Sequence, residues 1–242
     1  MNLFQLGSWL SLGSPVVAEV AAESGFDWLL FDLEHGCATD AALPDQLRSV
    51  KGTKARPIVR VGAPHIDLIG RVLDWGAHGI MVPRVCTAAD AERVVQAAHY
   101  APRGRRGVAR TVRAVGYGRR LPDPQQMPRP LILAQIETVE AVENAPAIAA
   151  VDGIDVLFIG PADLGYDLLA QKAACTYTDC VQRVAKAALA AGRQCGILLR
   201  RAEDIASMRE LGMTWVALDS DIGILRETYT RIIASVPRDA GA

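Results

Sequence analysis

The sequence predicts a single (β/α)8 barrel, and three observations lead to this fold. The chain has 242 residues, close to the roughly 250 that are typical of a one-domain barrel. It contains eight short apolar segments that are separated by longer amphipathic ones. Such alternation is typical of repeated βα units around a buried parallel sheet. We therefore expect one α/β domain over residues 1–242.

The expected strands are apolar runs bounded by Gly, Pro or Asp. In chain order they are Leu6–Leu10, Trp28–Asp32, Pro57–Val61, Gly79–Pro83, Leu131–Glu137, Val156–Gly160, Cys195–Leu199 and Trp215–Asp219. Eight parallel strands with intervening helices close into a barrel. An open doubly wound sheet is the alternative, but it usually has fewer strands and a glycine-rich turn after the first one. Gly7 and Gly13 flank the first strand here without forming that motif.

Helical segments fill the intervals between the strands. One runs from Thr87 to Tyr100, where Thr87 followed three residues later by Asp90 resembles an N-cap pairing. Another, Ala202–Leu211, is ended by Gly212. These signals predict helices at the places that a barrel requires.

The longest irregular stretch, from about residue 102 to 130, is rich in arginine. It contains Arg103, Arg105, Arg106, Arg110 and Arg113. A loop of this length is uncommon in a compact domain unless it is functional or disordered. We expect it to follow the fourth strand, at the catalytic mouth of the barrel. Because no aromatic residues that could stack on bases interrupt the arginines, a solvated or active-site loop is favoured over a nucleic-acid site.

Charge and composition argue against several classes of partner. Lys and Arg total 26 against 27 Asp and Glu, so no overall field attracts a phosphate backbone or an anionic membrane. The first eleven residues do not resemble a signal peptide, and no apolar run approaches the roughly 18 residues of a membrane span. Five cysteines without a C-x-x-C pair indicate neither a zinc site nor a disulfide framework. We expect a soluble cytoplasmic protein.

Polar side chains stand at the carboxyl ends of four expected strands, where barrel enzymes carry their reactive groups. They are Asp32, Glu34 and His35 after the second strand, Arg60 on the third, Glu137 on the fifth, and the run Gly160-Pro161-Ala162-Asp163 after the sixth. We expect these groups to share one cavity.

Glu137 and Asp163 are the candidate metal ligands, because hard divalent cations favour carboxylate oxygens. A cation held by these two side chains keeps coordination positions open, and a 2-oxo acid can occupy them as a chelating ligand. The cation also stabilises the negative charge that develops next to the carbonyl. The alternative makes Glu137 an N-cap and Asp163 a turn residue.

Arg60 at the end of an apolar strand needs an anionic partner, either a protein carboxylate or the substrate. His35 is a candidate proton relay, and Asp74 is a candidate to orient its imidazole. A structural role is the alternative for His35, and it is the preferred reading for His65, His78 and His99.

Several segments together resemble the HpcH/HpaI aldolase family over nearly the whole chain. They are residues 26–36 (FDWLLFDLEHG), 57–60 (PIVR), 79–83 (GIMVP), 100–107 (YAPRGRRG), 135–138 (QIET), 158–164 (FIGPADL) and 217–221 (ALDSD). Leu33 departs from the glycine of many relatives, and Gly165-Tyr166-Asp167 replaces a serine-containing continuation. These departures fall at the mouth, where the aldehyde partner would bind, so the sequence does not identify that aldehyde.

The resemblance implies a class II pyruvate aldolase similar to the 4-hydroxy-2-oxoheptanedioate and 2-dehydro-3-deoxyglucarate aldolases. Glu137 and Asp163 match the ligands of a divalent ion (Mg²⁺, Mn²⁺ or Co²⁺), and Arg60 matches the residue at the keto oxygen. His35 and Asp74 match the dyad that activates a metal-bound water as base. Asp32 and Glu34 match supporting positions near this dyad. In the run Gly160-Pro161-Ala162-Asp163, the backbone amides of Ala162 and Asp163 match the groups that bind the pyruvate carboxylate.

The resemblance also implies a homo-oligomer, a hexamer built as a trimer of dimers with exchanged C-terminal helices, which suits the amphipathic segment Ile222–Val236. A Schiff-base mechanism is disfavoured, because Lys51 and Lys54 precede the third strand. Two other functions stay open. One is an acyl-CoA ester lyase of the citrate lyase β-subunit type, and the other is a non-catalytic barrel that binds an organic acid.

Overall fold

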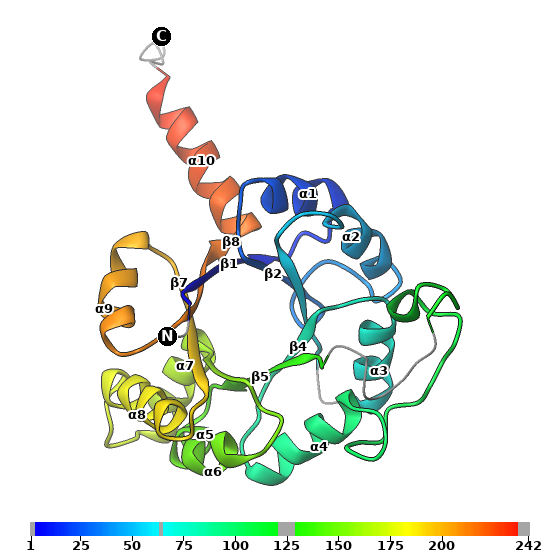
Figure 1. Ribbon diagram of the computed structural model, residues 1–242. Helices are drawn as coiled ribbons and strands as arrows, with labels where there is room; N and C mark the ends of the chain where they lie inside the picture. Colours follow the sequence, from blue (N-terminus) through cyan, green and yellow to red (C-terminus); the bar gives the residue numbers. More distant parts are fainter. Residues whose placement is uncertain (1–2, 63–64, 121–128, 237–242) are drawn as a thin grey trace.

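Eight parallel strands form a closed barrel in sequential order. The computed structural model describes residues 3–62, 65–120 and 129–236. Figure 1 views the barrel roughly along its axis, with the helices arranged around the strands. Pairing of β1 with β8, in which Gln5 lies opposite Trp215, closes the sheet. The predicted (β/α)8 barrel is confirmed.

Every expected strand is present, and no strand end differs from its expected position by more than one residue. The strands are β1 (Gln5–Leu10), β2 (Trp28–Asp32), β3 (Arg56–Arg60), β4 (Gly79–Val82), β5 (Leu131–Ile136), β6 (Val156–Ile159), β7 (Gln194–Leu199) and β8 (Trp215–Ser220).

The helices follow the strands in the expected alternation. They are α1 (Pro15–Glu23), α2 (Leu43–Ser49), α3 (Ile66–Asp74), α4 (Ala88–Ala98), α5 (Val139–Glu143), α6 (Ala145–Ala150), α7 (Pro161–Gln171), α8 (Tyr177–Ala190), α9 (Ile205–Glu210) and α10 (Asp221–Ser235), with short 3-10 turns at Arg113–Val115 and Ala202–Asp204. The predicted N-cap of α4 is confirmed, because Thr87 and Asp90 form a reciprocal capping box. The expected helix 202–211 starts as a 3-10 turn and continues as α9.

Two apolar layers stabilise the barrel, and the alternation of side chains along each strand fills both. On β2, Leu29 and Phe31 pack outward against the helices, whereas Trp28 and Leu30 point into the barrel. Trp28 packs against Trp215 with ring centroids 5.3 Å apart and the rings tilted by 41°. Because both tryptophans start their strands, they fill the N-terminal end of the barrel and leave the open space at the other end.

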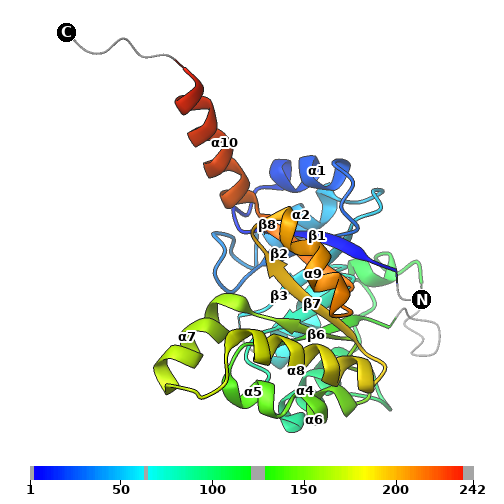
Figure 2. The same ribbon diagram turned by 90° about the vertical axis from the view of Figure 1, so that its left-hand side faces the viewer.

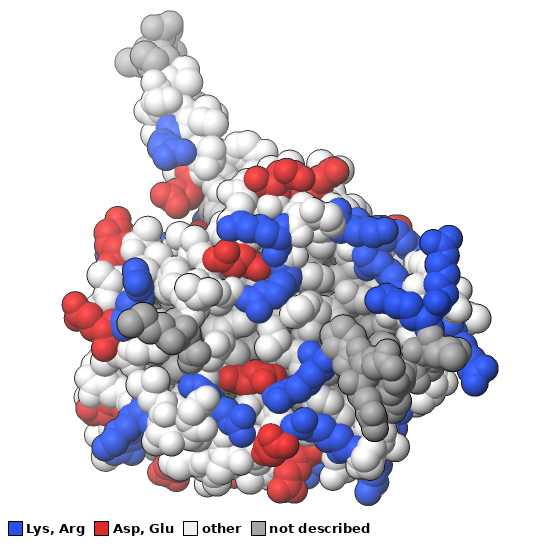
Figure 3. All heavy atoms as spheres, viewed as in Figure 1, with Lys and Arg blue, Asp and Glu red and all other residues white. Residues whose placement is uncertain are grey.

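The arginine-rich loop lies at the end of the barrel opposite to the one expected. It follows α4 rather than β4, so it leads to the N-terminal end of β5. Several of its arginines make structural contacts: Arg103 pairs with Asp152, and Arg113 donates to the carbonyl oxygens of Leu47 and Trp75. Figure 3 shows Lys and Arg side chains gathered at the right of this face. Residues 121–128 of the loop lie outside the described residues. The prediction that this loop lies at the catalytic mouth is therefore wrong.

The last helix, α10, extends away from the barrel (Figure 2). Several of its apolar side chains are exposed in the single chain, among them Ile224, Tyr229, Ile232 and Ile233. In the described part of the chain, no helix combines the length and apolar character that a membrane span requires. The exchange of α10 between subunits stays a prediction.

Candidate active site

A cavity of about 500 Å³ opens at the C-terminal ends of the strands, within the range of small-molecule sites. Its walls combine aromatic and polar side chains, and the described residues that line it include Trp9, Ser11, Asp32, His35, Arg60, Gln135, Phe158, residues 159–163, Leu198, Arg200 and Ser220. Trp9 and Phe158 pack together with ring centroids 5.7 Å apart. Residues from all four strand ends identified from the sequence therefore line one cavity, whereas Glu34 and Glu137 are not among its lining residues and stand beside Arg60 and Gln135.

Arg60 is buried in this cavity and bound to two carboxylates, those of Asp32 and Glu34. Its Nε and Nη2 donate to the two oxygens of Asp32 at 2.9 and 2.7 Å, and Nη1 lies 2.8 Å from Glu34 Oε2. The guanidinium carbon lies 5.1 Å from the ring centroid of Trp9. Since a guanidinium has five N–H donors, these three contacts leave two for a further acceptor.

Asp32 shapes the loop that carries Glu34 and His35. Its Oδ1 accepts the backbone N–H groups of both residues, at 3.0 and 3.3 Å. Burial alone would raise the pKa of Asp32, but the hydrogen bonds and charge of Arg60 hold it below its usual value. Asp32 is therefore the ionised anchor of Arg60.

Glu34 and His35 stand next to each other at the mouth, with His35 Nε2 4.0 Å from Glu34 Oε2. The His35 side chain is 68% exposed, so it is accessible to a ligand or to water. Burial raises the pKa of Glu34 even though the charge of Arg60 lowers it, and the neighbouring carboxylates of Asp32 and Asp163 raise it further.

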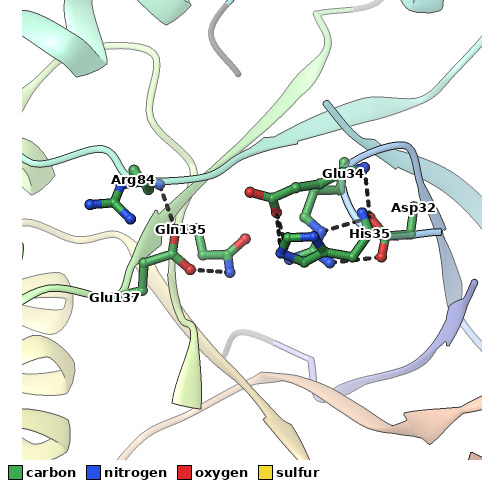
Figure 4. A network of polar contacts seen from close by, with 7 residues as sticks. Asp32, Glu34, His35, Arg84, Gln135 and Glu137 are labelled. Atoms are coloured by element: carbon green, nitrogen blue, oxygen red, sulfur yellow. Dashed lines mark hydrogen bonds and ion pairs between the residues drawn. The ribbon is translucent and has the colours of Figure 1, made fainter. Parts of the chain in front are cut away.

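Glu137 is almost completely buried directly after β5. Its Oε1 accepts the backbone N–H of Arg84 at 2.7 Å, and its Oε2 accepts a hydrogen bond from Gln135 Nε2 (Figure 4). Burial raises its pKa to about 7, and the charges of Asp163 and Glu34 add to this rise. The helix cap next to it is Thr138, which accepts from Ala141, so Glu137 is not the N-cap of the alternative interpretation.

Asp163 lies in the first turn of α7, directly after β6. The helix begins at Gly160-Pro161, and a Cβ at Gly160 would collide with the side chains of Gln135 and Glu137. This position therefore requires glycine, because α7 starts in close contact with β5. The backbone N–H groups of a first helical turn have no partner within the helix, and they favour anions.

The donor atoms around Glu137 suit a hard cation. Two carboxylates, Glu137 and Asp163, are close enough for the charge of one to raise the pKa of the other. Among the described residues, the buried Oε1 of Gln135 has no hydrogen-bond partner. Oxygen donors of these kinds are the ones that Mg²⁺ and Mn²⁺ prefer. In the described part of the chain, no group of three or more His, Cys, Asp or Glu side chains is arranged for a metal.

Within the single chain Asp74 pairs with Arg106 and not with His35, so the expected pairing with His35 stays a prediction. Asp74 is the last residue of α3, and its Oδ1 accepts from Arg106 Nη2 at 2.6 Å. Arg106 lines a different cavity, with Pro57, His78 and Pro130 at the starts of strands. The physical reason is topological, because a helix of a βα unit ends near the N-terminal ends of the strands.

Sequence reasoning named Gln135 only as part of a strand end, and it missed two other contributors to the site, the backbone of Arg84 and the side chain of Arg200. Gln135 and the backbone N–H of Arg84 hold Glu137, and Arg200 lines the cavity from the end of β7. Arg84 has a φ of 52°, which no local pattern signals. Arg200 directly follows an apolar strand, as Arg60 ends one, so the same strand-end rule would have found it.

A model of the HpcH/HpaI aldolase/citrate lyase family matches residues 5–228. The chain belongs to this family. The 5-keto-4-deoxy-D-glucarate aldolase of Salmonella paratyphi C is 37% identical over 232 residues, which cover 94% of this chain and 90% of that protein. The protein of the same name from Citrobacter koseri is 36% identical over 232 residues, with the same coverage of both chains.

Solved structures agree with this assignment. A HpcH/HpaI aldolase/citrate lyase family protein from Burkholderia cenocepacia J2315 superposes with a TM-score of 0.90 at 32% identity, covering 96% of this chain and 94% of that one. The citrate synthase SbnG superposes with a TM-score of 0.84 at 30% identity, covering 97% and 93%. The chain is thus a carbon–carbon lyase of the HpcH/HpaI family.

Proposed function

We propose that this protein is a class II aldolase that reversibly joins pyruvate, or a similar 2-oxo acid such as hydroxypyruvate, to an aldehyde. The observation that carries the proposal is the pair of acidic side chains, Glu137 and Asp163, next to the buried Arg60. Asp163 and Arg60 line one cavity, and Glu137 is close enough to both for their charges to shift its pKa. The relatives named 5-keto-4-deoxy-D-glucarate aldolase support the same reaction class.

Glu137 and Asp163 would hold a divalent cation such as Mg²⁺, Mn²⁺ or Co²⁺, with the Gln135 Oε1 beside them. When bound, this ion supplies Lewis-acid stabilisation of the negative charge that develops on the keto oxygen. Burial, together with the charges of Asp163 and Glu34, raises the pKa of Glu137, and a cation beside it would stabilise its charged form.

The chain itself would bind and orient the 2-oxo acid. The first-turn amides of Ala162 and Asp163, which follow Gly160 and Pro161, would receive its carboxylate. Arg60 would donate one of its two remaining N–H groups to the keto oxygen. Asp32 and Glu34 hold the guanidinium in place, so it needs little reorganisation when charge develops.

Proton transfer would take place at the mouth of the cavity. His35 is exposed there, and Glu34 is the carboxylate within reach of its ring. We assign His35 as the group that takes a proton, directly or through water, from the carbon next to the keto group, and that returns it in the reverse direction. Asp74 would take part in this step only if another copy of the chain supplied it, because within one chain Asp74 pairs with Arg106.

We also propose that the protein works in the cytoplasm as a homo-oligomer. All five cysteines are free thiols, which suits a reducing compartment. The exposed apolar side chains of α10 suit a contact between copies, and the family resemblance favours a hexamer with exchanged C-terminal helices.

The decisive experiment measures cleavage of 4-hydroxy-2-oxo acids after chelation and metal add-back. Glu137→Gln and Asp163→Asn should each lower the metal-stimulated rate at least ~100-fold, and both should weaken Mn²⁺ binding measured by calorimetry. Glu140→Gln is the matched control, because Glu140 is exposed one turn away. His35→Ala should slow turnover and retain metal binding.

Three results would contradict the proposal. One is full metal-stimulated cleavage by both carboxylate variants. Another is turnover of malyl-CoA or citramalyl-CoA with no cleavage of 4-hydroxy-2-oxo acids, which would favour the acyl-CoA lyase. The third is binding of 2-oxo acids without any turnover, which would favour a non-catalytic binding protein.

A further inference from the structure

Arg200 is a cation at the edge of the cavity that the proposed mechanism does not use. It directly follows β7 and lines the cavity together with Ser220 at the end of β8. Its Nη1 donates to Asp219 Oδ1 at 2.7 Å. The Arg200 side chain is 65% exposed, whereas that of Asp219 is 15% exposed. A partly buried carboxylate therefore holds an exposed guanidinium at the cavity wall.

The backbone at Asp219 is unusual and points to a function for this pair. Asp219 has a φ of 51°, in the left-handed region that costs a non-glycine residue of order 1 kcal/mol. Its carboxylate lies so close to α10 that a Cβ on Gly223 would collide with it. An ion pair with one exposed partner contributes little to stability. Stability alone thus does not account for a strained acidic residue whose carboxylate holds Arg200.

The charges of the cavity leave Arg200 as the cation available to a second anion. Arg60 is already neutralised by Asp32 and Glu34. Asp163 and Glu137 make the inner part acidic until a cation is bound. Among the described residues that line the cavity, Arg200 is the other cation, and its one carboxylate partner occupies only Nη1. The remaining N–H groups of a guanidinium suit a carboxylate.

We propose that Arg200, held by Asp219, binds a second carboxylate at the far end of the substrate and thereby selects an acidic aldehyde. This inference rests on the proposed function, because the first carboxylate is placed at the start of α7. The 2-oxo acid end then lies near β5 and β6, and the rest of the molecule extends toward the ends of β7 and β8. Arg200 is a specificity-determining residue and takes no part in breaking the carbon–carbon bond.

A binding experiment tests this assignment without requiring turnover. The probes are 2-oxohexanedioate and 2-oxohexanoate, which differ only in having a carboxylate or a methyl group at the far end. Calorimetry in Mg²⁺ should show that the wild-type protein binds the diacid about tenfold more tightly, the effect of one charge-assisted hydrogen bond to an exposed partner. Arg200→Gln should abolish this preference and leave binding of the monoacid within about twofold.

Three further variants separate the role of Arg200 from a general effect of charge. Arg200→Lys keeps the charge and should retain part of the preference. Asp219→Asn should reduce it, because the guanidinium loses its anchor. Arg201→Gln is the matched control, since Arg201 is exposed and paired with Asp204 outside the cavity, and it should leave the preference unchanged. Size-exclusion chromatography should give the same assembly for all variants.

Cleavage kinetics provide the second measurement. For a 4-hydroxy-2-oxo diacid, Arg200→Gln should raise KM and lower kcat/KM about tenfold, while kcat/KM for the matching monoacid stays within about twofold. The proposal is overturned if the variant affects both substrates equally, if the diacid preference survives it, or if the wild-type protein shows no such preference. A preference in binding without any cleavage would refute the proposed aldolase, and it would support only the binding of a second carboxylate by Arg200.

Discussion

Asp32 and Glu137 stand at the C-terminal ends of two strands, and their carboxyl groups have opposite pKa shifts. Burial acts on both, but Asp32 receives two hydrogen bonds from Arg60, which lower its pKa below the usual value. Glu137 lacks such a cation and is close to other carboxylates, so its pKa rises to about 7. One side chain thus serves as a fixed anion, and the other is poised to receive a cation.

His99 provides a pH prediction away from the cavity. It is buried, and burial, together with the charges of nearby arginines, lowers its pKa from 6.5 to about 4. The unfolded chain therefore takes up the proton first as the pH falls. The stability that neutral His99 contributes is complete above about pH 6.5 and is lost as the pH falls toward 4, by as much as about 3 kcal/mol.

Urea unfolding at pH 7.5 and at pH 4.5 measures this loss. His99→Leu should lose less of its free energy of unfolding between the two pH values than the wild-type protein loses. His65→Gln is the control, because His65 is exposed, and it should behave as the wild type does. Equal losses for the wild-type protein and His99→Leu would show that His99 does not titrate in this range.

At the scale of elements, Asp221 joins the start of α10 to the loop after β1. Its carboxylate accepts the backbone N–H groups of Ser11, Leu12 and Ile222 at 2.9, 3.0 and 2.8 Å. Asp221→Ala would leave these donors without an acceptor, and we expect it to lower the free energy of unfolding by about 2–3 kcal/mol. Asp45→Ala, at an exposed position on α2, should cost less than about 0.5 kcal/mol.

Chemical denaturation of both variants checks this prediction, and Asp221→Asn should give an intermediate value because its amide oxygen still accepts. A loss below about 1 kcal/mol for Asp221→Ala would mean that water replaces the carboxylate at this junction.

Strand positions could be predicted because they depend on local patterns, whereas long-range contacts could not. The apolar run at 28–32 is a strand in any parallel barrel, and its last residue, Asp32, necessarily lies at the mouth.

The partner of Asp74 is 32 positions away at Arg106, and no periodicity indicates it. No sequence pattern indicates the positive φ of Asp219 either. The place of the loop 102–130 was predictable, because a segment between a helix and the next strand must lie at the N-terminal ends.

At the scale of the whole molecule, the barrel has a filled end and an open end. The tryptophans at the starts of β2 and β8 fill one end, and the cavity occupies the other. Beyond this compact unit, α10 carries its apolar side chains into the solvent (Figure 2). Because exposed apolar surface is unfavourable in water, and contiguous patches mark contact sites, we expect other copies of the chain to cover this helix.

The exposed face of α10 gives the prediction for assembly. Ile232 and Ile233 are 50% and 55% exposed in the single chain, so charges at both positions would disrupt a contact between copies without disturbing the barrel core. Sedimentation velocity should find the wild-type protein as an oligomer and the Ile232→Asp/Ile233→Asp variant as a smaller species with an unchanged circular dichroism spectrum. Leu189→Asp, at a comparably exposed position on α8, should assemble as the wild type does. A monomeric wild-type protein, or a double variant that assembles normally, would contradict the expected role of α10.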